Sequence, residues 1–223
     1  MKRLLGTVTI GQSPRSDIMP DILPILGDNI EVVEAGALDG FTKEQVAGMA
    51  PEKGDYVLVT RMRDGSSVTV AEKYITPKVE EKIRDHFRQG RKIVLLLCTG
   101  EFPSFGEEGL LIRPQRILYH VVQAIAENKR LAVITPSPEQ IPQSRKRWQE
   151  VSDNLTIAAA SPYGAPSELD EAAKKLKGEA PEVVVMDCMG YTMKMQDRVR
   201  EYTGAPVVLA RSIVARVIRE MIG

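Results

Sequence analysis

Two apolar segments of the chain end in the same short pattern, and this pattern limits the folds that the chain can adopt. Residues 92–102 read KIVLLLCTGEF and residues 182–192 read EVVVMDCMGYT. Cys98 and Cys188 are the only cysteines, and a glycine follows two residues after each. A short apolar run closed by glycine is typical of a buried strand in a parallel sheet. Because open α/β sheets bind ligands at the carboxyl ends of their strands, both cysteines are predicted to lie where such a fold places its chemistry.

The composition argues against several classes of function. Lys+Arg and Asp+Glu both number 30 in 223 residues, so the formal net charge is zero. Nucleic-acid partners require a basic excess or patch, and none is expected here. No apolar run approaches the ~20 residues of a membrane helix, and polar residues interrupt the first segment, so neither a membrane span nor a signal peptide is expected. These features predict a cytoplasmic protein with reduced thiols, although a disulfide stays open.

Metal and nucleotide sites are also not expected. His86 and His120 lie in helical stretches with no cysteine or histidine at ligand spacing. The chain contains neither G-x-x-x-x-G-K-[ST] nor G-x-G-x-x-G. Neither a metal site nor a phosphate-binding loop is therefore expected.

The spacing of apolar and turn residues predicts an α/β protein. In the first half, a helix is expected from residue 14 to about residue 26, with Ser13 as its N-cap and two prolines inside. Two short strands around Arg63-Asp64-Gly65 predict an extra β-hairpin. The predicted strands of the parallel layers are residues 4–10, 30–35, the run ending at Cys98, 110–112, 131–135, 155–160, 182–188 and 207–210.

The order of these elements repeats. Residues 5–10 match 131–135, residues 29–32 match 154–157, and residues 93–100 match 183–190. The alternative is that all βαβ proteins look self-similar. A true repeat predicts two pseudo-symmetric parallel α/β domains with a cleft between them, residues 1–113 plus 211–223 and residues 114–210. Cys98 and Cys188 would then lie on opposite walls of one cleft.

Two facing thiols suit proton transfer at a carbon. One cysteine, as thiolate, takes a proton from one face, and the other, as thiol, gives a proton to the opposite face. A free thiol has a pKa near ~8.5, so the site must favour the thiolate, and N–H groups in the glycine-containing turns do this. The alternative for each cysteine is a small buried apolar residue at a strand end.

Three blocks carry a resemblance to a known family. Residues 9–15 (TIGQSPR), 60–65 (TRMRDG) and 186–191 (MDCMGY) resemble the AroM family, over nearly the whole chain. That family is similar to a branch of the Asp/Glu/hydantoin racemase superfamily. The resemblance implies two α/β domains related by a pseudo-dyad, two cysteines in a central cleft and no cofactor. The superfamily includes racemases, decarboxylases and a cis–trans isomerase that use cysteine differently.

The sequence also departs from the better-known racemases. They carry an acidic residue near the end of the first strand, often as Asp-Ser-Gly, where this chain has Gly11-Gln12-Ser13. Many have Cys-Thr-His at the second cysteine, where this chain has Cys188-Met189-Gly190. Asp187 is not a substitute, because alternation along a strand points it to the other face.

Other residues near the strand ends are candidates for binding the substrate. Gln12 and Ser13 could hold a carboxylate or amide, Ser13 having the N-cap role as its alternative. Arg15 and Arg61 could pair with a carboxylate, or could be solvated cations. The remaining candidates follow the third predicted strand of each half or the first strand of the second half: Thr99, Gly100, Thr135, Ser137, Met189 and Gly190.

The leading hypothesis is a cofactor-independent racemase- or epimerase-like isomerase that acts on a small carboxylate-bearing molecule, with Cys98 and Cys188 as the acid/base pair. A cysteine-dependent isomerase or decarboxylase needs only one thiol. A binding protein that kept the cleft without the chemistry is the alternative from another class. The expected partner is a small carboxylate ligand, with no nucleic acid and no membrane, and a homodimer is left open.

Overall fold

The chain forms two α/β units, which we describe separately. The computed structural model describes residues 2–106 and 108–223. The first unit comprises residues 1–115 and 215–223, and the second comprises residues 116–214. Among the described residues, no helix combines the length and apolar character needed to cross a bilayer.

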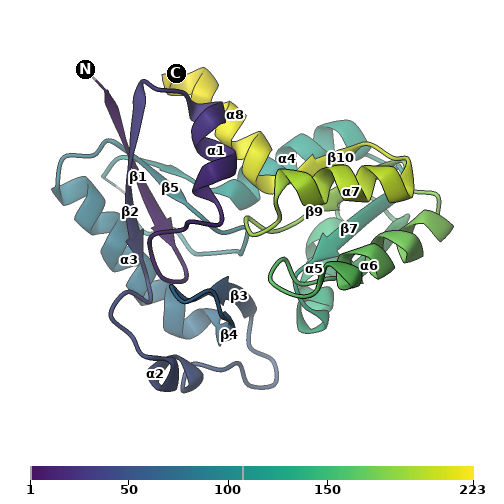
Figure 1. Ribbon diagram of the computed structural model, residues 1–223, viewed down its shortest axis with the longest axis horizontal. Coiled ribbons are helices and arrows are strands. Elements are labelled where there is room, and N and C mark those ends of the chain that lie inside the picture. Colours follow the sequence, from purple (N-terminus) through teal and green to yellow (C-terminus); the bar gives the residue numbers. More distant parts are fainter. Residues whose placement is uncertain (1, 107) are drawn as a thin grey trace. The chain divides into compact units, whose positions relative to one another are not determined.

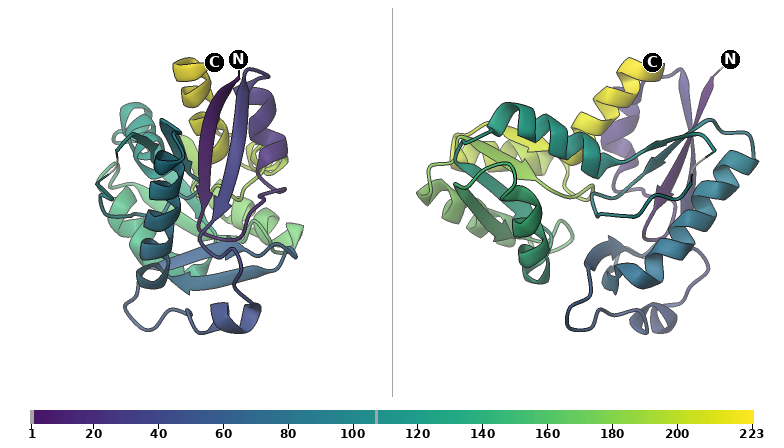
Figure 2. Two further views of the ribbon diagram at one scale, coloured as in Figure 1. Left: turned by 90° about the vertical axis from the view of Figure 1, so that its left-hand side faces the viewer. Right: turned by 180° about the vertical axis from the view of Figure 1, so that it is seen from behind.

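The first unit is built on a four-stranded parallel sheet in the order β2-β1-β5-β6. Helix α3 covers one face, where its Ile75, Val79 and Ile83 pack against Val8 and Leu96, and α1 covers the other (Figures 1 and 2). The elements are β1 (Arg3–Thr9), α1 (Met19–Leu26), β2 (Ile30–Gly36), α2 (Lys43–Ala47), β3 (Val57–Arg61), β4 (Ser67–Ala71), α3 (Glu72–Arg88), β5 (Ile93–Leu96) and β6 (Leu110–Ile112).

The second unit repeats this plan, with sheet order β10-β9-β7-β8. Helices α6 and α7 pack on one face, against a core that includes Ile134 and Met186. Helices α4 and α8 begin in one unit and end in the other. The elements are α4 (Pro114–Ala126), β7 (Leu131–Thr135), the 3-10 helix η1 (Pro138–Gln140), α5 (Ile141–Trp148), β8 (Leu155–Ala159), α6 (Pro166–Gly178), β9 (Val183–Met186), α7 (Met193–Thr203), β10 (Val207–Leu209) and α8 (Ala210–Ile222).

The predicted repeat is confirmed by equivalent hydrogen bonds at the strand ends. The amide after β5 donates to Val8 (Leu97 N to O, 2.7 Å), and its counterpart after β9 donates to Ile134 (Asp187 N to O, 3.0 Å). The amides of Ala37 and Ala160 likewise donate to the carbonyls at the ends of β1 and β7. The carboxyl ends of the two sheets therefore have the same local construction.

The extra hairpin is confirmed as the antiparallel pair β3-β4. It interrupts the first half between β2 and α3, and Figure 1 shows it beside α2. Its Leu58 and Val70 join the core formed by α3 and β1. The insertion is thus packed against the end of the sheet that carries Cys98.

The predicted start of the first helix is wrong. Helix α1 begins at Met19, and its N-cap residue Ile18 makes no side-chain cap. The hydroxyl of Ser13, which the sequence suggested as N-cap, donates to Asp39 Oδ2 at 2.6 Å instead. Residues 13–18 therefore form an irregular segment held by side chains, and Pro20 rather than Pro14 lies in the first turn.

Candidate functional site

Cys98 lies two residues beyond the end of β5, at the carboxyl edge of the first sheet. Its side chain is almost buried, at 8% exposure, and it joins the core of that unit. The amide of Gly100 donates to its Sγ atom at 3.2 Å. A Cβ on Gly100 would lie 2.7 Å from Leu58 Cδ2, so a larger residue here would require the Leu58 side chain to move. The chain then reaches β6 through a loop rather than entering a helix.

Cys188 has the matching position beyond β9. The amide of Gly190 donates to its Sγ atom at 3.3 Å, and its side chain is half-buried. A Cβ on Gly190 would lie 2.7 Å from the hydroxyl of Tyr163. Here the turn leads into α7, whose N-cap Thr192 accepts a hydrogen bond from Met195 N at 3.2 Å.

In both turns a backbone N–H group donates a hydrogen bond to the cysteine sulfur. A sulfur that accepts a hydrogen bond from an N–H group is stabilised more as an anion than as a neutral thiol. Neither cysteine is in a disulfide, so both sulfurs are in the reduced form that acid/base or nucleophilic chemistry requires. The arrangement therefore presents one thiol with a backbone donor in each unit.

Asp187 contacts the side of its sheet opposite Cys188, as alternation predicted. Its Oδ2 accepts from Trp148 Nε1 at 2.9 Å and from Arg147 Nη1 at 3.1 Å, both on α5. Cys188 instead packs with the α6 and α7 core. The Asp187 carboxylate thus anchors the strand end.

The Tyr191 hydroxyl, three residues after Cys188, donates to Ala160 O at 2.6 Å. Burial, and secondarily the negative charges that Cys188 and Asp187 can carry, raise the pKa of Tyr191 well above its ordinary value. Tyr191 is therefore a neutral donor that ties the Cys188 turn to the end of β8.

Gln12 occupies the loop after β1 and holds three backbone groups. Its Nε2 donates to Leu38 O at 3.0 Å and to Phe41 O at 2.9 Å, and its Oε1 accepts from Arg63 N at 2.8 Å. The amide thus connects β1 to the loop before α2 and to the hairpin. Its role as a substrate ligand stays a prediction.

Arg15 and Arg61 both reach Asp17. The buried Arg15 guanidinium binds both Asp17 carboxylate oxygens at 2.8 Å, and Arg61 Nη1 lies 3.7 Å from Oδ1. Burial opposes ionisation of Asp17, but hydrogen bonds and charge from Arg15, with a smaller contribution from Arg61, outweigh it and lower the pKa of this carboxyl group. Any carboxylate of a substrate would compete with Asp17 for these cations.

Asp39, in the loop after β2, is a residue that the sequence interpretation did not single out. It accepts from Ser13 N and Gly36 N, each at 2.8 Å, besides the Ser13 hydroxyl. Arg63 Nη2 lies 3.4 Å from its Oδ1. The sequence of the first strand's end lacks the acidic residue of the better-known racemases. The Asp39 carboxylate nevertheless reaches this region from the loop after β2. The signal that could have found it is the Asp39-Gly40 pair, which marks a turn four residues after the predicted strand 30–35.

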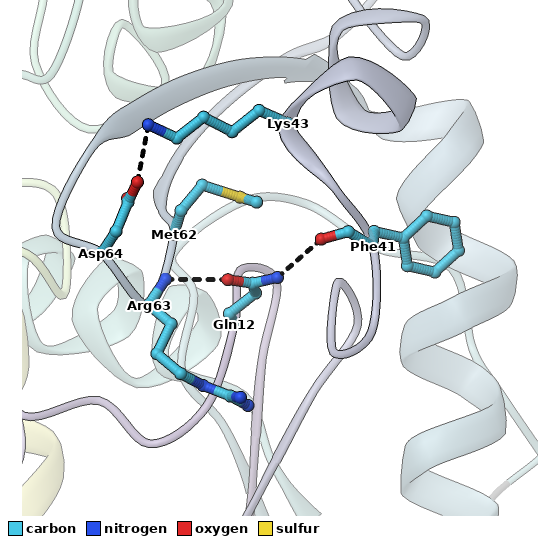
Figure 3. Close-up of a pocket in the computed structure, with 6 residues that line it drawn as sticks. All are labelled: Gln12, Phe41, Lys43, Met62, Arg63 and Asp64. Carbon is cyan, nitrogen blue, oxygen red and sulfur yellow. Dashed lines mark hydrogen bonds and ion pairs between the residues drawn. The ribbon is translucent and has the colours of Figure 1, made fainter.

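A hollow of about 380 Å³ opens beside Gln12, between the hairpin turn and the segment before α2 (Figure 3). Lys43 and Asp64 face each other across its rim, with Nζ and Oδ2 2.6 Å apart. Its wall is partly apolar, and its lining residues are Gln12, Phe41, Lys43, Met62, Arg63 and Asp64.

The remaining predicted ligands lie at the same strand ends. Thr135 ends β7 and is buried, and the Ser137 hydroxyl donates to Glu139 Oε2 at 2.5 Å. Thr99 and Met189 follow the two cysteines and are both buried. Substrate binding by these four residues stays a prediction.

Arg211 is the other residue that the sequence interpretation missed. It is fully buried at the start of α8 and donates to the carbonyl oxygens of Met189 and Gly190, in the turn after Cys188. The available signal was an arginine directly after the apolar strand segment VVLA. For metals, no group of three or more His, Cys, Asp or Glu side chains within residues 2–106 and 108–223 is arranged to hold an ion.

Comparisons with known proteins agree with this architecture. The family model described as AroM protein matches residues 5–222. Allantoin racemase from Klebsiella pneumoniae superimposes with a TM-score of 0.64 at 14% identity, covering 99% of this chain and 88% of that one. Glutamate racemase from Aquifex pyrophilus gives 0.60 at 12% identity, covering 99% and 84%.

A third similar structure is a cysteine-to-serine mutant of Nocardia farcinica maleate cis-trans isomerase, described with a covalently bound succinylcysteine intermediate. It gives a TM-score of 0.64 at 13% identity and covers 99% of this chain and 93% of that one. The comparison with curated proteins gives no match. The structural similarities identify an Asp/Glu racemase-like fold shared with enzymes of different reactions.

Proposed function

Because this chain belongs to the AroM family and has an Asp/Glu racemase-like fold, we propose that it is a cofactor-independent isomerase of the racemase or epimerase kind. The substrate is a small molecule with a carboxylate, and Cys98 and Cys188 are its acid/base pair. The observation that carries the proposal is the duplicated thiol, each following a central strand and each accepting a hydrogen bond from a glycine amide.

The proposed reaction moves protons only. A cysteine thiolate removes the proton on the carbon next to the carboxylate, and the electron pair passes into the carboxylate as an enediolate. The other cysteine, as a thiol, gives its proton to the opposite face of the carbon. Substrate and product have the same atoms, and the two thiols have exchanged protonation states. The amides of the glycine turns are suited to bind the developing negative charge.

The first test is proton exchange with solvent. The protein is incubated in D₂O with each enantiomer of candidate amino and hydroxy acids, and deuterium at the reacting carbon is followed by NMR together with the chirality of the product. We expect deuterium in the inverted enantiomer with the unmodified protein. Cys98→Ser and Cys188→Ser should each lose interconversion by at least about 10²-fold, the smaller end of what a positioned acid or base contributes.

The control is Thr203→Val, which removes a hydroxyl that donates to Val199 O at 2.8 Å near the C-terminal end of α7. It should leave exchange unchanged, because the Cys188 turn leads into the opposite end of this helix. Interconversion that survives in both cysteine variants would exclude the two-thiol mechanism. Binding of a ligand without any exchange would favour a carboxylate-binding protein on the same scaffold.

A second candidate is covalent catalysis by one cysteine. It is favoured by the maleate isomerase similarity, because that structure carries a succinylcysteine. Mass spectrometry after acid quenching separates the two reactions. An adduct of substrate mass on one cysteine supports covalent catalysis by a nucleophilic isomerase, whereas proton transfer leaves both cysteines unmodified.

A further inference from the structure

Arg211 is placed directly behind the turn that follows Cys188. It is fully buried, with 0% of its surface exposed. Its Nε and Nη2 atoms donate to Met189 O at 2.9 and 2.7 Å, and Nη2 also donates to Gly190 O at 2.8 Å. A buried cation therefore binds the two carbonyl groups that follow the cysteine.

One of these carbonyls shares a peptide group with the amide that binds the sulfur. Met189 O and Gly190 N–H belong to the same peptide, which is trans and therefore directs them to opposite sides. The N–H donates to Cys188 Sγ at 3.3 Å, while the oxygen accepts from Arg211. The guanidinium and the sulfur thus bind the two ends of one peptide dipole. A cationic donor on the oxygen polarises that peptide and strengthens its N–H as a donor to an anion.

We propose that Arg211 is a positioning residue that keeps Cys188 as the thiolate by polarising the Met189–Gly190 peptide. This inference rests on the proposed function, and it assigns Cys188 as the base that removes the proton and Cys98 as the acid that returns one.

The first half of the repeat supplies the contrast. Leu95, three residues before Cys98, pairs with Ile112, and Val185, three residues before Cys188, pairs with Val208. Counting three residues onward places the neutral Gln115 in the first half where Arg211 lies in the second. The Gly100 amide also binds its cysteine, at 3.2 Å. Each thiol therefore accepts a hydrogen bond from a glycine amide, but the position that holds Arg211 in the second half holds the neutral Gln115 in the first.

Other titratable groups near Cys188 do not oppose this assignment. Asp187 directs its carboxylate to Arg147 and Trp148 on α5. Tyr191 is held neutral by the rise in its pKa on burial. Tyr163 approaches the turn at Gly190 with its hydroxyl. A thiolate at Cys188 is thus placed beside the neutral phenol of Tyr191 and a carboxylate whose charge is already paired with an arginine.

The test measures ionisation of each thiol without any substrate. The rate of alkylation by iodoacetamide is recorded against pH for Cys188 in the Cys98→Ser protein and for Cys98 in the Cys188→Ser protein. We expect Cys188 to titrate below the ~8.5 of a free thiol, and below Cys98. Adding Arg211→Gln, which keeps donors to the carbonyls but removes the charge, should raise the midpoint for Cys188 by about one pH unit. Alkylation near pH 7 then slows by up to about tenfold, since thiolate is the reacting form.

Two variants separate this effect from a purely structural one. Arg211→Lys keeps the charge and should retain most of the shift. Arg219→Gln on the same helix removes an arginine whose Nη1 donates to Leu26 O at 2.7 Å, and it should leave the Cys188 midpoint unchanged. Circular dichroism confirms that each variant is folded.

The inference is overturned if Cys188 titrates at the same pH in folded Arg211→Gln as in its parent. It is also overturned if Cys98 titrates at a lower pH than Cys188. This comparison uses proteins with Arg211 unchanged, so it tests the inference even if the Arg211→Gln protein does not fold. Because alkylation requires no substrate, a protein with the expected midpoints but no proton exchange would contradict the proposed function alone.

Discussion

The carboxylate of Asp187 accepts a hydrogen bond from the indole of Trp148 at 2.9 Å. Asp187 directly precedes Cys188 in the chain. Arg147 donates to the same oxygen at 3.1 Å, and all three side chains are buried. The contact fixes the end of β9 to α5 on one face of the sheet. Since successive side chains alternate, it also directs the Cys188 sulfur to the other face. The geometry at this cysteine therefore depends on an ion pair on the opposite face of the sheet.

Asp187→Asn should destabilise the protein strongly, because it leaves the Arg147 cation buried without its counterion. Breaking one partner of a buried pair costs about 3–5 kcal/mol. Urea unfolding gives the free energy. The matched control is Asp197→Asn, which breaks the exposed Arg200–Asp197 pair and should cost less than about 1 kcal/mol. Equal losses in the two variants would show that the buried pair does not anchor the strand.

Gly6→Ala should destabilise the first unit by steric conflict with α3. A Cβ at this position in β1 would lie 2.8 Å from Nδ1 and 2.9 Å from Cγ of the buried His86. Overpacking of this kind costs typically about 1–3 kcal/mol. In a His86→Ala background the added methyl group should cost much less, and thermal unfolding of the four proteins measures the coupling. Additive effects of the two substitutions would rule out this contact as the cause.

His86 should make the stability depend on pH below neutrality. Burial, and then the charge of Arg91, lower its pKa, while a hydrogen bond to the Thr7 carbonyl opposes the shift. The unfolded chain therefore binds the proton more readily than the folded one. Stability is retained above the ordinary pKa of ~6.5 and is lost as the pH falls through that value toward the lower folded pKa. His86→Leu should flatten this part of the curve in urea unfolding at pH 5–8, and an unchanged slope would assign the dependence to other groups.

The parallel layers could be predicted because their signal is local. Residues 131–135 were predicted as a strand and are β7, and the glycine that ends α7 has the left-handed conformation expected of a C-cap. The first helix could not be predicted in the same way. Ser13 and Pro14 form a good local start, but Asp39 is 26 residues away in sequence and takes the Ser13 hydroxyl. Tertiary hydrogen bonds override local preference there.

Some residues of the candidate site could likewise be identified from local sequence, whereas others depend on tertiary contacts. The matched cysteines and their glycine turns follow from the repeat, so the sequence was sufficient to find them. Arg211 could not be found by spacing, because its role arises from the packing of α8 against a turn 21 residues earlier in the chain. Gln12 was identified as a polar residue at a strand end, but only the structure shows which backbone groups its amide binds.

Gln12→Leu should loosen the hairpin from the end of β1. The substitution nearly preserves volume but removes the partners of two carbonyls, Leu38 O and Phe41 O, and of the Arg63 amide. Unsatisfied groups of this kind cost about 1–3 kcal/mol. Hydrogen exchange followed by mass spectrometry should show faster exchange in residues 62–66 than in the unmodified protein.

The control for this change is Gln45→Leu, which removes an exposed amide that accepts from Thr42 N at the start of α2. It should cost less than about 1 kcal/mol and leave exchange in the hairpin unaltered, because the lost group is solvated in either case. If Gln12→Leu also leaves the hairpin protected, the β3-β4 core contacts of Leu58 and Val70 hold it without the amide. The Gln12 side chain would then be available to bind a substrate at the hollow beside it.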